Sequence, residues 1–162
     1  MELTTTSSRA VAGVAVLLVS ACARMYVSPL SPPPFRAAIR APYDAAWGGL
    51  VQALAKANIP LRAIARDSGV IASDEFVTPI GLFADCGHIG DDRIEGEALV
   101  SFTIFTEDTG PETQLLINSK MRTHAARRGS SGNLRPTPVY QCASTGRFEA
   151  NLLDAAQEAV KK

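Results

Sequence analysis

The chain has 162 residues, and its 16 Lys and Arg residues balance 16 Asp and Glu residues, so its formal net charge is zero. This balance argues against a dedicated nucleic-acid-binding protein, because such proteins carry a strong excess of positive charge. A chain of this length suits one domain with a modest hydrophobic core.

The N-terminal segment has the pattern of a secretory signal peptide. Mostly polar residues that include Arg9 precede an uncharged run from Ala10 to Ala21. This run is shorter than the roughly 20 residues that a membrane-spanning helix needs, but it fits the apolar region of a signal peptide. Two alternatives are an ordinary cleaved signal peptide followed by an incidental cysteine, and a retained membrane anchor.

The apolar run ends in Val19-Ser20-Ala21-Cys22, which resembles the lipobox of bacterial lipoproteins. The resemblance implies that residues 1–21 are removed and that Cys22 becomes the first, lipid-bearing residue of the mature protein. Several acyl chains anchor a protein stably in a membrane, whereas one chain does not. Ala23 follows the cysteine in place of Asp, which implies the outer membrane of the bacterial envelope, facing the periplasm.

Residues 22–34 contain four prolines and are predicted to be an extended tether after the lipid anchor. Polyproline geometry advances about 3.1 Å per residue, so such a tether would reach roughly 35–40 Å. Residues 35–162 are expected to form a single domain beyond it.

The first half of this domain contains one helix and three strands. A short strand, Phe35–Arg40, precedes a helix from about Tyr43 to Asn58, in which apolar residues recur at helical spacing. Two strands, Leu61–Arg66 and Val70–Val77, then flank the turn Asp67-Ser68-Gly69. Glycine suits this turn because it adopts positive φ most easily.

The second half contains two strands with clear period-2 alternation, Ala98–Thr106 and Thr113–Thr123, and a final helix from about Thr145 to Lys161. Either Ser144 or Thr145 is expected to cap that helix. The alternation gives each strand one buried face and one solvent-exposed face, as antiparallel sheets allow. The order β-α-β-β-β-β-α predicts an α+β fold, an antiparallel sheet of about five strands with two helices packed on one face.

Two long segments, Thr78–Gly96 and Ala126–Gln141, show no periodicity and are expected to be irregular. Cys86 lies in the first and Cys142 follows the second, so a disulfide between them would pin the two segments together. An oxidising compartment favours this pairing, and two free buried thiols are the alternative. The bridge would close a loop of about 57 residues and stabilise the fold by roughly 4 kcal/mol.

A helix that begins Pro42-Tyr43-Asp44-Ala45-Ala46-Trp47 precedes the hairpin Ile64–Ile71 with its Asp-Ser-Gly turn. Near the end of the chain, Cys142–Glu149 has the pattern Cys-x-Ser-Thr-Gly-x-Phe-Glu. These segments resemble small domains of bacterial lipoproteins, including the BamC-like components of the outer-membrane β-barrel assembly machinery. The resemblance implies an α+β domain with a role in envelope assembly.

No catalytic constellation and no cofactor motif stands out, so we expect a non-enzymatic protein. Four possible metal ligands share one loop: Asp85, His88, Asp91 and Asp92. Their spacing matches no defined zinc or calcium site, so no metal is expected. The other histidine, His124, stands apart, and Ser144-Thr145-Gly146 lacks the pattern of a nucleophile elbow.

One local excess of positive charge comes from five residues: Lys120, Arg122, Arg127, Arg128 and Arg135. Because Lys120 and Arg122 alternate along one strand, they are predicted to lie on the same side of it. Such a patch would suit anionic lipid headgroups or an acidic partner. The alternative is a solvated face that nearby acidic residues partly neutralise.

The combined hypothesis is an envelope lipoprotein, held on the membrane through Cys22, with a non-catalytic protein-interaction or envelope-assembly role and an envelope protein as its partner. The alternative is a periplasmic module that binds a small ligand or lipid between helix and sheet. An exposed apolar groove beside Trp47 would favour the alternative, and a closed core would favour the first hypothesis.

Overall fold

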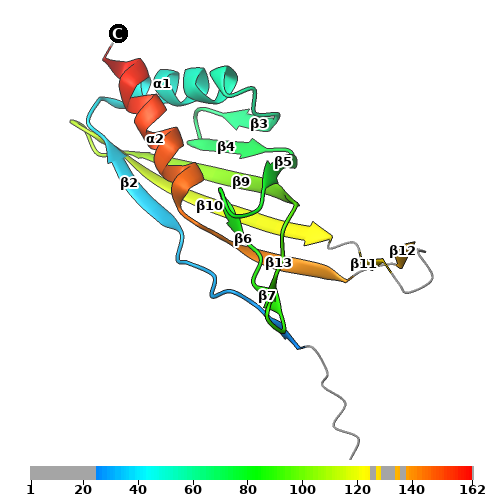
Figure 1. Ribbon diagram of the computed structural model, residues 1–162. Helices are drawn as coiled ribbons and strands as arrows, with labels where there is room; N and C mark the ends of the chain where they lie inside the picture. Colours follow the sequence, from blue (N-terminus) through cyan, green and yellow to red (C-terminus); the bar gives the residue numbers. More distant parts are fainter. Residues whose placement is uncertain (1–24, 125–126, 129–133, 136–137, 162) are drawn as a thin grey trace, which may run out of the picture.

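The computed structural model describes residues 25–124, 127–128, 134–135 and 138–161 (Figure 1). The predicted signal peptide and Cys22 lie outside these residues. The fold is α+β, with two helices packed together over a mainly antiparallel sheet of eight strands, and a small sheet of three strands beside it. The predicted fold class is therefore confirmed, although the sheet is larger than the five strands that the sequence indicates.

A long hairpin forms the centre of the sheet. Strands β9 (Glu97–Asp108) and β10 (Thr113–His124) pair from Thr113 opposite Asp108 to Arg122 opposite Leu99. Successive side chains of a strand point to opposite faces, so alternate residues of β9 turn toward the helices. The buried residues of β9 follow this rule: Ala98, Val100, Phe102 and Ile104. The two period-2 strands of the sequence are confirmed.

Two short strands cover the outer edge of β9. Strand β4 (Val70–Ser73) pairs with the C-terminal half of β9 and, on its other side, with β3 (Leu61–Ala65). Strand β5 (Phe76–Pro79) pairs with the first residues of β9. The predicted strand Val70–Val77 is thus two strands. At the junction, the Oγ of Ser73 accepts a hydrogen bond of 2.9 Å from the backbone N–H of Phe102. This side-chain contact bridges the interruption in the ladder.

Two strands likewise follow one another along the outer edge of β10. Strand β2 (Phe35–Ile39) pairs with residues 113–117, and β13 (Val139–Ser144) pairs with residues 121–124. Strand β6 (Ala84–Asp85) then pairs with the end of β13. The sequence predicts β2 but not β13 or β6.

The segments predicted to be irregular contain several two-residue strands, so that prediction is wrong in part. Strands β7 (His88–Ile89) and β8 (Asp92–Arg93) lie in the first segment. Strands β11 (Arg127–Arg128) and β12 (Leu134–Arg135) lie in the second. Two residues are too few to show an alternating pattern, and these strands depend on partners that are distant in the chain or joined through a loop.

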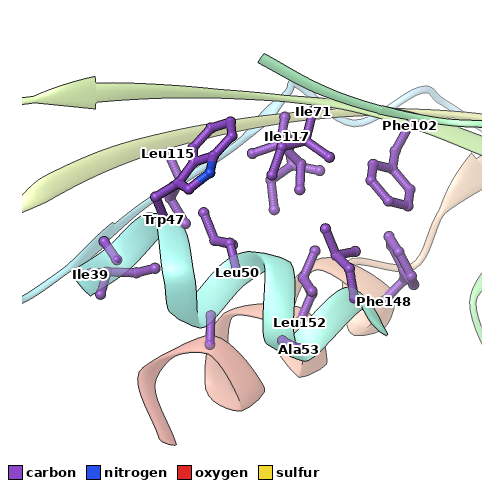
Figure 2. Packing of buried hydrophobic residues seen from close by; sticks show 14 of the residues in the cluster. Ile39, Trp47, Leu50, Ala53, Ile71, Phe102, Leu115, Ile117, Phe148 and Leu152 are labelled. Carbon is purple, nitrogen blue, oxygen red and sulfur yellow. The ribbon is translucent and has the colours of Figure 1, made fainter. Parts of the chain in front are cut away.

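Helices α1 (Tyr43–Lys56) and α2 (Arg147–Val160) pack against each other and cover one face of the sheet (Figure 1). Figure 2 shows the side chains that fill the space between them, among them Leu50, Leu152 and Ile117. Trp47 belongs to this core and is only 8% exposed. The main core is therefore closed beside Trp47.

The predicted cap of the second helix is wrong. Gly146 occupies the N-cap position of α2 with φ of 79°, and no side chain caps the helix. The Oγ1 of Thr145 instead donates a hydrogen bond of 2.9 Å to the carbonyl of Leu82, and the Oγ of Ser144 donates one of 2.8 Å to Glu149. The positive φ of Gly146 turns the chain sharply, so these two hydroxyls bond elsewhere.

Candidate functional site at the disulfide end of the domain

Cys86 and Cys142 form a disulfide, with their Cα atoms 4.1 Å apart, and this confirms the predicted pair. Cys86 directly follows β6 and Cys142 lies in β13, so the bridge extends the pairing of these two strands. Cys86 is fully buried in a second hydrophobic cluster: Ala84, Cys86, Ile94, Ala98, Val100 and Met121. The disulfide therefore fixes the segment Thr78–Gly96 to the edge of the sheet.

The N-terminal part of the chain contacts the domain at this same end. Strand β1 (Tyr26–Val27), within the predicted tether, pairs with β7, so that Tyr26 lies opposite Ile89. The hydroxyl of Tyr26 donates a hydrogen bond of 2.9 Å to the carbonyl of Gln141. The backbone N–H of Gly90 donates a further bond of 3.1 Å to the carbonyl of Met25. The chain thus joins the domain ten residues before Phe35.

Gly87 allows this close approach. Its φ is 75°, and a Cβ at this position would lie 2.0 Å from the carbonyl oxygen of Val27. An L residue would clash with the backbone there and would also resist the positive φ. The residue that follows Cys86 must therefore be glycine if β1 is to dock on β7.

The predicted basic patch divides into two parts. Arg122 forms a bidentate ion pair with Glu75, with Nε–Oε1 and Nη2–Oε2 distances of 2.9 and 2.8 Å. The hydrogen bond from Arg122 lowers the pKa of Glu75, and the same bond raises the pKa of Arg122. Lys120 is exposed and has no ion-pair partner within the described part of the chain. The positive charge of Arg122 is therefore compensated by Glu75, whereas the positive charge of Lys120 is available to a partner.

The other three residues of the patch lie on one small hairpin. Strand β11 pairs with β12 in a register that places Arg127 opposite Arg135, and Arg128 opposite Leu134. This hairpin follows the end of the β10–β13 pair, where His124 lies opposite Val139. The backbone thus brings three arginine positions together beyond the disulfide end of the sheet.

The loop that contains the four possible metal ligands, Asp85 to Asp92, is held by local hydrogen bonds to its backbone. The Oδ1 of Asp85 accepts a hydrogen bond of 3.0 Å from the N–H of Gly87, and Nδ1 of His88 lies 2.6 Å from the carbonyl oxygen of Gly90. No group of three or more His, Cys, Asp or Glu residues suited to a metal ion occurs among the described residues.

Several apolar side chains near this end are open to solvent. Met25 is 73% exposed and Leu30 is 94% exposed, and Val27 and Val139 are also exposed. Within the described ranges, no helix has the length and apolar character needed to cross a membrane. No protein-family model matches the chain, and no curated protein sequence matches it.

Proposed function

We propose that this chain is a lipoprotein of the bacterial cell envelope, anchored through acyl chains on Cys22, with a domain that binds an envelope protein and performs no catalysis. The cysteine pairing is the main observation that supports it. The chain has three cysteines, and two of them, Cys86 and Cys142, form the disulfide, which leaves Cys22 as the remaining thiol. A structural disulfide suits an oxidising compartment, which is where a lipoprotein domain works.

On this proposal, the disulfide end of the domain lies close to the bilayer. Cys22 precedes Tyr26 by four residues, and an extended chain spans at most about 3.6 Å per residue. The anchor is then within about 14 Å of the docked strand β1. The exposed Met25 and Leu30 would face the interfacial region. The arginines of the β11–β12 hairpin would suit anionic headgroups or an acidic partner beside them.

The closed core supports a protein-interaction role over a ligand site between helix and sheet. Trp47, Leu50 and Leu152 fill that space and are all buried. A partner would therefore bind an outer surface of the domain. The resemblance of residues 41–74 and 142–149 to BamC-like domains is in keeping with a partner in envelope assembly.

Membrane fractionation of two variants tests the anchor. The Cys22→Ser variant should leave the membrane fraction after a high-salt wash, whereas the Cys86→Ser/Cys142→Ser double variant should stay, because it keeps Cys22. A Cys22→Ser variant that stays in the washed membrane would contradict the lipid anchor and favour a retained apolar segment.

Binding to vesicles tests the basic hairpin separately. We expect the Arg127→Glu/Arg128→Glu variant to bind vesicles that contain anionic phosphatidylglycerol more weakly than the unchanged protein. Lys56→Glu, at an exposed position near the end of α1, is the matched control and should have a smaller effect. Equal binding by all three proteins would remove lipid headgroups as the partner of the hairpin.

A further inference from the structure

The outer edge of β10 has a break that no strand among the described residues covers. Strand β2 pairs as far as Ile117 and β13 begins its pairing at Met121, so within the described residues no strand pairs with Asn118, Ser119 and Lys120 on this side. The equivalent interruption beside β9 is bridged by the side chain of Ser73. The break in β10 has no such bridge in the described part of the chain.

The backbone groups of Ser119 point into this break. Ser119 lies opposite Phe102 of β9, whose N–H points away from β10 to the Oγ of Ser73. In an antiparallel ladder the two residues of such a pair direct their N–H and C=O groups outward. Ser119 therefore presents one donor and one acceptor toward the open edge. Its side-chain Oγ is also buried and has no hydrogen-bond partner in the part of the chain that the structure describes.

A pocket of about 580 Å³ surrounds the break. Residues from both faces of the sheet line it, since Thr103 and Asn118 alternate with the buried Phe102 and Ile117. The pocket therefore reaches the gap where β2 and β13 separate. Residues Ser31–Pro34 form one wall. This volume lies in the range of small-molecule sites, which is about 300–1,000 Å³.

One acidic and two basic side chains line the pocket. Glu149 lines it from the helix side and is only 3% exposed, and the hydroxyl of Ser144 donates to its Oε2 at 2.8 Å. No cation pairs with Glu149 among the described residues, although its place in the first turn of α2 favours a negative charge. Arg62 and Lys120 line the pocket too, and neither has an ion-pair partner within the same residues.

We propose that this pocket binds a short zwitterionic peptide. One peptide unit of the ligand pairs with the backbone of Ser119, as a strand does when it adds to an open sheet edge. The ammonium group lies toward Glu149, where a positive charge compensates the buried carboxylate. The carboxylate lies toward Arg62 and Lys120. This inference goes beyond the proposed envelope role and does not depend on the lipid at Cys22.

Calorimetric titration of the protein, purified from membranes in detergent, with tri-alanine tests the site. We expect saturable binding with a Kd at or below about 1 mM. N-acetyl-tri-alanine amide, which has the same backbone without charges, should bind at least about tenfold weaker. Amide NMR shifts should centre on Asn118–Lys120. Equal affinity for the two peptides, or no saturable binding of tri-alanine up to about 10 mM, would overturn the proposal.

Variants separate the roles of the groups. Glu149→Gln should weaken tri-alanine binding at least about tenfold while it leaves the affinity for the capped peptide unchanged. Ser119→Ala keeps the backbone groups that pair with the ligand, so it should leave the affinity for tri-alanine unchanged, and it should not lower the Tm of the free protein, because it removes an unsatisfied buried hydroxyl. Lys56→Gln is the matched control and should change neither property. Full affinity for tri-alanine in Glu149→Gln would refute the assignment, even if this variant is less stable.

Discussion

The hydroxyl of Tyr26 donates a hydrogen bond of 2.9 Å to the carbonyl of Gln141, and the ring of Tyr26 lies 4.5 Å from the ring of Tyr140. This contact joins residues 115 positions apart. It holds the first described residues of the chain against the disulfide end. The position of the domain relative to its proposed anchor therefore depends on this side chain together with the pairing of β1 and β7.

Substitution of Tyr26 should loosen strand β1 without unfolding the domain. Tyr26→Phe removes one hydrogen bond, worth about 1 kcal/mol, and Tyr26→Ala also removes the ring contact. Hydrogen exchange of the β1 and β7 amides should therefore accelerate, more in Tyr26→Ala than in Tyr26→Phe. Tyr43→Phe is the control, because it removes a comparable bond to the carbonyl of Arg66 elsewhere. Unchanged exchange in Tyr26→Ala would show that β1 is held by other contacts.

Adjacent glycines of α1 should respond oppositely to alanine. A Cβ at Gly49 would lie 2.8 Å from the carbonyl oxygen of Ala156 in α2, whereas a Cβ at Gly48 meets nothing within 4 Å. Gly48→Ala should stabilise by up to about 1 kcal/mol through helix propensity. Gly49→Ala should destabilise, typically by about 1–3 kcal/mol, because the helices must separate. Urea denaturation measures both, and equal effects would contradict the close packing of α1 on α2.

Loss of the disulfide should lower the free energy of unfolding. The bonded cysteines are 56 positions apart, and chain entropy gives about 4 kcal/mol as an upper value for such a loop. Denaturation of the native protein with and without reductant measures the change. The Cys86→Ala/Cys142→Ala variant is the control and should not respond to reductant. A denaturation midpoint of the native protein that reductant does not move would contradict this contribution.

The ion pair of Glu75 and Arg122 should make a small, pH-dependent contribution to stability. The hydrogen bond from Arg122 lowers the pKa of Glu75 below its ordinary value of 4.5. A lowered folded-state pKa means that the contribution is present above the unfolded pKa and is lost as pH falls through the folded pKa. Because both side chains are exposed, salt should weaken the effect.

An NMR titration of the Glu75 carboxyl group checks this directly. The midpoint should lie below 4.5 in the unchanged protein and should rise in Arg122→Gln. Arg62→Gln is the control, since Arg62 does not pair with Glu75. A midpoint that stays the same after Arg122→Gln would show that the pair does not persist in solution.

The sequence predicts those elements whose patterns are long and local. Strands β9 and β10 alternate between buried and more exposed residues over most of their length, and both helices carry clear apolar stripes. The two-residue strands β6 and β7 show no pattern, because distant partners define them. The open edge at Ser119 depends on where β2 ends and β13 begins, so only the folded structure shows it.

The disulfide is the part of the candidate site that could be predicted, since it follows from cysteine count and compartment. The basic patch shows the limit of that reasoning. Lys120 and Arg122 do alternate along β10, but Glu75, which neutralises Arg122, belongs to a different part of the chain. The docking of Tyr26 on β13 is likewise a long-range contact that residues 22–34 alone do not indicate.

Mass spectrometry of the N-terminal peptide, recovered from the membrane fraction of cells that make the protein, tests the central claim most directly. The account predicts a peptide that begins at Cys22 and carries diacylglycerol on its sulfur. A peptide that still contains residues 1–21, or one that begins with an unmodified Cys22, would contradict it.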